Sequence, residues 1–229
     1  MNRSSEMWLL ILVAMALIGA YNAQSPAPGQ SVIVRTLALD SFLLLCVSLM
    51  IGPLSTLWPD RFAQLIEPRR AVGIASFVFM AAHGILAIAL MMKFNLNAVF
   101  GNPDLLIAVP ALLLYLALAL TSSNWAVSTL GNNNWKNLHR LTYLAFLLVL
   151  GHFLLKSNGL WRGANNLNLS EVALVALGAA TVILQIIGLN AKIKRKEDAI
   201  TAGPRKEPET KPSVPPISAP AFSGIKTAK

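Results

Sequence analysis

The sequence predicts an all-α integral membrane protein that folds as a six-helix transmembrane bundle. Of its 229 residues, 55% are hydrophobic and only 13% are charged, whereas charged residues make up about 25% of an ordinary soluble domain. The charges are absent from long apolar stretches and crowd into the segments between them, which is the pattern of membrane spans and loops. All three histidines lie inside apolar stretches. Because an ionisable side chain is costly in hydrocarbon, these histidines are candidates for a functional role.

Six stretches come close to the roughly 20 apolar residues that a helix needs to cross a bilayer: 7–23, 33–57, 71–92, 104–122, 137–156 and 170–191. The first stretch is similar to a signal peptide, since a basic start is followed by an apolar core and small residues. It lacks a good Ala-x-Ala cleavage site before Gln24, so we expect a retained helix that acts as a signal anchor.

Three regions follow from these spans. Residues 1–30 form the N-terminal span and its loop, residues 31–192 form a transmembrane domain, and residues 193–229 form a C-terminal tail. The tail is basic and contains six prolines from residue 197 onward, which predicts a disordered segment. Of the nineteen Lys and Arg residues, nine lie between residues 192 and 229. A basic stretch directly after a span favours the lipid surface as its partner over nucleic acid.

The distribution of positive charge predicts how the spans are oriented. If the six spans alternate in direction, fifteen Lys and Arg residues fall on the side that holds both termini, and four fall on the other side. By the positive-inside rule, both termini then lie in the cytoplasm, and the chain is a multi-pass protein of a bacterial inner membrane.

Two histidines are expected at the same depth in the membrane. His83 lies thirteen residues after Arg70, and His152 lies thirteen residues after His139. At 1.5 Å per residue, both lie about 20 Å from the inner edge. Two histidines on neighbouring helices at one depth suit the axial positions of a haem b iron. Small residues flank both, including Gly84 and Gly151; they either leave room for the macrocycle or simply pack helices together.

His139 lies too far toward the cytoplasmic side to share that haem. It is either a ligand of a second haem in the inner half of the membrane or a polar residue at the start of its span. Arg69 lies at the same depth, and a guanidinium normally pairs with a haem propionate. His139 and His152 are about 140° apart around an ideal helix. The two side chains can therefore face the same haem channel only if the helix is irregular or the channel is wide.

Two segments resemble the ferric reductase-like transmembrane domain superfamily. They are EPRRAVGIASFVFMAAHGILA and LALALTSSNWAVSTLGNNNWKNLHRLTYLAFLLVLGHFLL, and the resemblance extends over about residues 35–190. The superfamily includes NADPH oxidases, ferric reductases and the haem-binding subunit of the bacterial periplasmic methionine sulfoxide reductase system. The resemblance implies that His83, His152 and His139 ligate haem iron. Larger members carry a fourth histidine at the position of Arg69. The sulfoxide reductase subunit is similar to this chain in this respect, and the resemblance makes Arg69 a candidate residue of the inner site.

The resemblance also implies a function. We expect a cytochrome b that acts as the electron-transfer subunit of an oxidoreductase, holds one or two haem b groups and has no catalytic residue of its own. Larger relatives append a flavin- and NADPH-binding domain that this chain lacks, so the expected donor is a separate flavin reductase, reduced FMN or FAD, or quinol. The expected acceptor is a periplasmic redox enzyme, such as a molybdoenzyme that reduces methionine sulfoxide. Two alternatives are a stand-alone ferric or cupric reductase and a haem-free transporter or assembly factor with a histidine-lined cavity.

Overall fold

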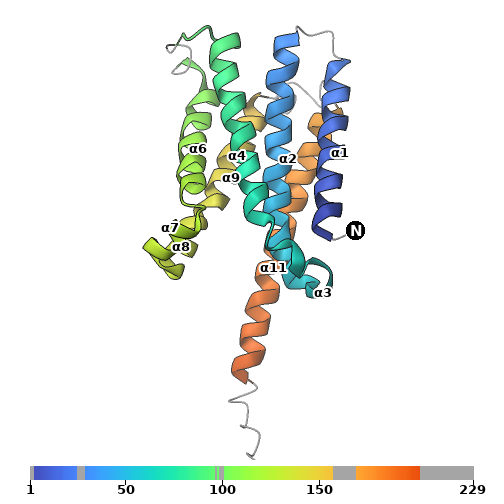
Figure 1. Cartoon of the computed structure of the whole chain (residues 1–229), viewed down its shortest axis with the longest axis vertical. Coiled ribbons are helices and arrows are strands. Elements are labelled where there is room, and N and C mark those ends of the chain that lie inside the picture. Colours follow the sequence, from blue (N-terminus) through green and yellow to red (C-terminus); the bar gives the residue numbers. More distant parts are fainter. Residues whose placement is uncertain (1–2, 25–28, 96, 98–100, 157–168, 202–229) are drawn as a thin grey trace, which may run out of the picture. The chain divides into compact units, whose positions relative to one another are not determined.

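The computed structural model describes residues 3–24, 29–95, 97, 101–156 and 169–201. All regular elements in this part of the chain are helices (Figure 1). Six of these helical segments are long and apolar enough to cross a membrane: 3–23, 29–57, 69–91, 103–120, 132–156 and 172–201. The protein is therefore a multi-pass membrane protein, and the all-α fold with six spans agrees with the sequence prediction. The chain divides into two units, Met1–Ile193 and Lys194–Lys229, and the bundle described below belongs to the first.

The first span is a helix, α1 (Arg3–Ala23), that packs on α2 (Gly29–Leu57). The amide of Asn22 donates to the Thr36 hydroxyl at 3.0 Å, and Gly19 faces the methyl group of Thr36. At the other end of α1, the Arg3 side chain donates to the Arg61 carbonyl. Contacts near both ends of α1 thus hold the helix in place.

Helix α2 is the centre of the bundle and lies between α1 and α4 (Arg69–Leu86) (Figure 1). Its most apolar stretch is 61% buried, against 22% or less for the other five spans. Ser41 and Ser76 each donate to the backbone carbonyl of the other, at 2.9 and 2.8 Å, which ties α2 to α4. Small polar residues of this kind commonly join helices in membranes. The aromatic ring of Phe42 stacks on the rings of Phe146 and Phe153.

Short elements link α2 to α4, and α4 does not end as a regular helix. Helix α3 (Pro59–Phe62) and the 3₁₀ turn η1 (Ala63–Leu65) form the link. After Leu86 the span continues as a π-helical turn, η2 (Ala87–Met91). Single π turns inside α-helices are frequently found at functional sites. The next span, α6 (Pro103–Leu120), packs on α4 and on α9 (Leu141–Lys156).

The fifth span is two helices instead of one. It consists of α8 (Asn132–His139) and α9, separated at Arg140, and it follows the short helix α7 (Asn124–Leu130). The sequence led us to expect one helix over 137–156. The interruption is confined to Arg140, which keeps helical dihedral angles (φ −65°, ψ −24°).

The last helix, α11 (Leu169–Thr201), runs about ten residues beyond the predicted end of the sixth span at residue 191. Residues 193–201 had been assigned to the disordered tail, and that part of the prediction is wrong. Lys, Arg, Glu and Ala are good helix formers, and the first proline of the tail is Pro204. The predicted disorder of residues 202–229 concerns a segment outside the described residues.

Candidate functional site

His83 and His152 lie at the end of the bundle where α2 and α6 begin. The Nδ1 atom of His83 is 2.8 Å from the Val34 carbonyl oxygen of α2. The Nδ1 atom of His152 is 2.8 Å from the Asp104 carbonyl oxygen of α6. The structure thus places at one end of the bundle the two residues that the sequence placed at one depth.

The two hydrogen bonds define the tautomer of both rings. A carbonyl oxygen only accepts, so Nδ1 carries a proton in each histidine, and in the neutral imidazole Nε2 is then the nitrogen with the lone pair. Metal-binding histidines typically donate their second ring N–H in this way, which orients the ring and raises its basicity. In His83 and His152 alike, a backbone carbonyl therefore engages Nδ1 and leaves Nε2 as the other ring nitrogen.

The small residues beside the two histidines differ in what surrounds them. A Cβ atom added to Gly151 would meet no atom within 4 Å, whereas one added to Gly84 would meet the Leu112 side chain at 3.6 Å, an ordinary contact. The space beside Gly151 is therefore open, and Gly84 is not required by tight helix packing.

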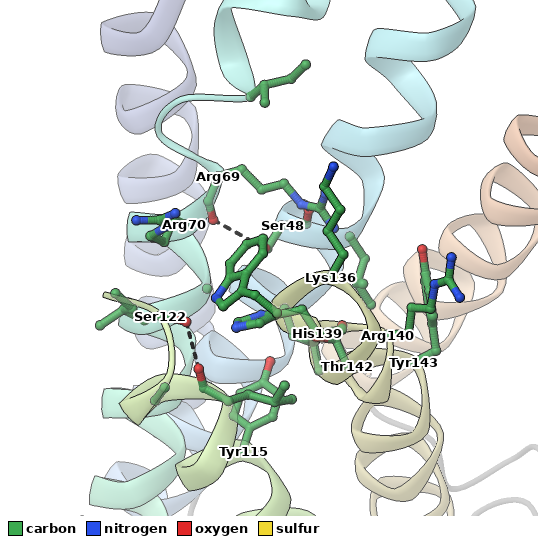
Figure 2. A pocket seen from close by; sticks show the side chains of 18 of the residues that line it. Ser48, Arg69, Arg70, Tyr115, Ser122, Lys136, His139, Arg140, Thr142 and Tyr143 are labelled. Carbon is green, nitrogen blue, oxygen red and sulfur yellow. Dashed lines mark hydrogen bonds between the residues drawn. The ribbon is translucent and has the colours of Figure 1, made fainter. Parts of the chain in front are cut away.

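A cavity of about 670 Å³ lies at the other end of the bundle, between α2, α4, α6 and the α8–α9 span (Figure 2). Its lining includes His139 and four cationic side chains, those of Arg69, Arg70, Lys136 and Arg140. One acidic residue, Glu67, also lines it. The inner histidine and Arg69, which the sequence placed at one depth, therefore share a cavity whose lining is rich in positive charge.

Arg69 is anchored against α2. Its Nε atom donates to the Ser48 carbonyl at 2.8 Å, and the Ser48 hydroxyl donates to the Arg69 carbonyl at 3.3 Å (Figure 2). A Cβ atom added to Gly52 would lie 3.3 Å from Nη1 of Arg69. Ser48 and Gly52 are one helical turn apart on α2. The Ser48 carbonyl binds the guanidinium at the cavity wall, and the absence of a side chain at Gly52 leaves space for it.

His139 is held differently from the other two histidines. Its Nε2 atom lies 3.4 Å from the Thr121 hydroxyl, which itself donates to the Ala117 carbonyl at 2.8 Å. The Trp135 ring lies over the imidazole with a centroid distance of 4.2 Å, and its indole N–H donates to the Thr121 carbonyl at 2.8 Å. Nε2 is thus the engaged nitrogen of His139, whereas it is the available nitrogen of His83 and His152.

Among the described residues, no group of three or more His, Cys, Asp or Glu side chains is placed to hold a metal ion. Two histidines alone complete the coordination of iron only when a macrocycle supplies the other ligands, as in a haem.

Several residues of the two ends were not found from the sequence. Two of them, Asp104 and Ser48, act through their backbone carbonyls, and Gly52 acts through its lack of a side chain. None of these features produces a recognisable sequence motif. Thr121 belongs to the Leu-Thr-Ser motif that carried the family resemblance, and this motif was the one available signal for it.

Comparison with known proteins agrees with this architecture. Residues 37–150 match the family model described as "Ferric reductase like transmembrane component". The heme-binding subunit MsrQ of protein-methionine-sulfoxide reductase from Agrobacterium fabrum is 32% identical over 115 residues, which are 48% of this chain and 52% of that protein. The MsrQ subunit of Ralstonia nicotianae is 27% identical over 183 residues, 77% of this chain and 80% of that protein.

A second kind of relative is the magnetosome protein MamZ of Magnetospirillum gryphiswaldense, 31% identical over 122 residues, which are 52% of this chain and 18% of that protein. The chain thus spans about half of the Agrobacterium relative and less than a fifth of MamZ. No solved structure matches the chain. The family match, which includes His83 and His139 and ends two residues before His152, agrees with the six membrane helices and the similarity to MsrQ subunits, and the chain belongs to the ferric reductase-like transmembrane family.

Proposed function

We propose that this protein is a transmembrane cytochrome b that passes electrons from a cytoplasmic donor to a periplasmic acceptor. The observation that carries the proposal is the pair of histidines at one end of the bundle, each with Nδ1 bonded to a backbone carbonyl. Nε2 of both rings is then available as a ligand. The relatives named MsrQ are heme-binding subunits, which supports the same reading.

The residues present fit a haem b at the outer end. His83 and His152 would hold the iron, and the open position beside Gly151 would leave room for the ring. When bound there, a haem supplies reversible one-electron transfer. The protein orients the two imidazoles and surrounds them with a low dielectric, both of which influence the reduction potential.

The inner cavity is the proposed site of electron uptake. His139 and Arg69 would hold a second haem there, or the cavity would receive the donor directly. Its four cationic side chains suit an anionic group such as a propionate or a flavin phosphate, because guanidinium groups bind carboxylates and phosphates through several hydrogen bonds. The donor is then a flavin reductase or its reduced FMN or FAD, with quinol as the alternative.

The proposed acceptor is the catalytic subunit of a periplasmic methionine sulfoxide reductase. The support is the similarity to MsrQ, whose name assigns it to a protein-methionine-sulfoxide reductase. The orientation this requires, with both termini in the cytoplasm, rests on the asymmetry of fifteen against four Lys and Arg residues and the positive-inside rule.

Reduced-minus-oxidised spectra of the purified protein test the haem assignment. We expect a low-spin b-type signal that is lost in His83→Ala and in His152→Ala. His139→Ala is the matched control and should keep the outer signal, because its ring lies at the opposite end of the bundle. A normal spectrum in either of the first two variants would refute the assignment, and a colourless wild-type protein would favour a haem-free transporter.

A further inference from the structure

An ion pair involves the residue that accepts a hydrogen bond from His152. Asp104 uses its backbone carbonyl to accept the hydrogen bond from Nδ1 of His152 at 2.8 Å. The same residue places its carboxylate Oδ2 atom 3.4 Å from the ammonium group of Lys156. One residue therefore links the orientation of an imidazole to a pair of opposite charges.

The two partners of the ion pair are unequally exposed. The Asp104 side chain is 15% exposed and that of Lys156 is 71% exposed. The Oδ2 atom itself is fully buried and accepts no hydrogen bond from the residues that the structure describes. The ammonium group of Lys156 is thus the opposite charge next to this carboxylate oxygen. Because Lys156 is the more exposed partner, solvent screens its charge more than that of Asp104.

Lys156 is also close to His152 along α9. It follows His152 by four residues on α9, so both side chains lie on the same face of the helix, one turn apart. One cation is therefore close to His152, with one anion beside it.

A purely structural explanation is available for both residues. Asp104 lies in the first turn of α6, where a carboxylate stabilises the helix dipole, and surface ion pairs contribute little to stability. This explanation predicts no electronic effect at the histidines, so measurement can separate it from a functional role.

We propose that Asp104 and Lys156 are positioning residues that together tune the reduction potential of the centre held by His83 and His152. The inference rests on the proposed function. A nearby positive charge favours the reduced, less positive state of an iron centre, and a nearby negative charge favours the oxidised state. With the pair intact the two effects oppose each other, so the potential depends on their balance.

Redox titration of the purified, haem-loaded protein tests this balance. Asp104→Asn leaves the lysine uncompensated and should shift the midpoint potential upward. Lys156→Gln leaves the buried carboxylate uncompensated and should shift it downward. The double variant should return close to the wild-type value. Lys93→Gln is the control, because it removes a lysine from another loop at the end of α4 and should leave the potential unchanged.

The outcomes separate this inference from the proposed function. Opposite shifts in the two single variants, with the haem spectrum retained, support the inference. Unchanged potentials, or shifts in the same direction, overturn it and leave the haem assignment to His83 and His152 standing. If His83→Ala and His152→Ala keep the haem signal, the proposed function fails, and the inference fails with it.

Discussion

At the scale of single residues, the three histidines differ in which ring nitrogen is engaged. The carbonyls of Val34 and Asp104 engage Nδ1 of the outer pair, whereas the Thr121 hydroxyl approaches Nε2 of His139. A ring whose Nε2 is already engaged must rotate or give up that contact before this nitrogen ligates a metal. In the proposed haem site the outer pair would keep its Nδ1 contacts on ligation, whereas the inner histidine would lose its Nε2 contact.

Gly52 provides a test of how the inner site is organised. Replacing it with Val would place a branched side chain where the guanidinium of Arg69 lies, since even a Cβ atom would be 3.3 Å from Nη1. We expect the displaced arginine to slow haem reduction by a flavin donor several-fold, with an unchanged outer-haem spectrum. Stopped-flow absorbance measures both quantities. Gly52→Ala should give a smaller effect, and equal rates in all three proteins would contradict the assigned role of Arg69.

At the scale of the elements, the two spans that carry histidines are irregular close to them. The fifth span breaks at Arg140, directly after His139, and the third changes to a π-helical turn at Ala87, four residues after His83. The remaining spans carry no histidine, and their helices in the described part of the chain are continuous.

Helix packing between α2 and α11 depends on Gly188. A Cβ atom there would lie 2.9 Å from Cβ and 3.1 Å from Cα of Pro53, a position that the proline backbone cannot easily vacate. We expect Gly188→Ala to destabilise the protein by about 1–3 kcal/mol, the typical cost of overpacking. Thermal unfolding in detergent measures the change. Gly19→Ala is the matched control, because its new Cβ would meet Thr36 at an ordinary 3.8 Å; an equal loss in both variants would contradict the packing argument.

At the scale of the whole molecule, both the spans and the separation of the histidines into two ends were predictable, because hydrophobic length and the 1.5 Å rise per residue determine them. The tautomers were not predictable, since Val34 and Asp104 act through backbone carbonyls that any residue possesses. The ion pair of Asp104 with Lys156 joins residues 52 positions apart, and only the packing of α6 on α9 brings them together. The extension of α11 to Thr201 was missed because its polar composition suggested disorder, although its residues are good helix formers.

The proposed membrane orientation makes a direct prediction for reporter fusions. A fusion of alkaline phosphatase after Lys196 should be inactive, because that position belongs to the side with fifteen Lys and Arg residues. A fusion after Lys93, on the side with four, should be active. Green fluorescent protein at the same two positions should give the reverse result. Activity of the phosphatase after Lys196 would invert the topology and exchange the inner and outer ends.

Electron uptake can be followed with purified components. NADPH alone should leave the haem oxidised, and NADPH with a flavin reductase should reduce it, with a rate that falls as salt screens the cationic cavity. Anaerobic absorbance records the reduction. Rapid reduction by NADPH in a flavin-free preparation would exclude a separate donor, and reduction by a quinol analogue only would favour the membrane pool. Ferric reduction without any partner protein would favour a stand-alone metal reductase.

The placement of His139 and of the His83–His152 pair at opposite ends of the bundle has an energetic consequence. An electron that travels between these ends crosses most of the bilayer and therefore moves a charge through the membrane potential. A full crossing is worth about 2.3 kcal/mol per 100 mV. With the termini in the cytoplasm, the electron moves away from the negative interior, so an energised membrane assists its outward transfer. Each electron delivered would then partly discharge the membrane, and collapsing the potential with an ionophore should slow the outward step.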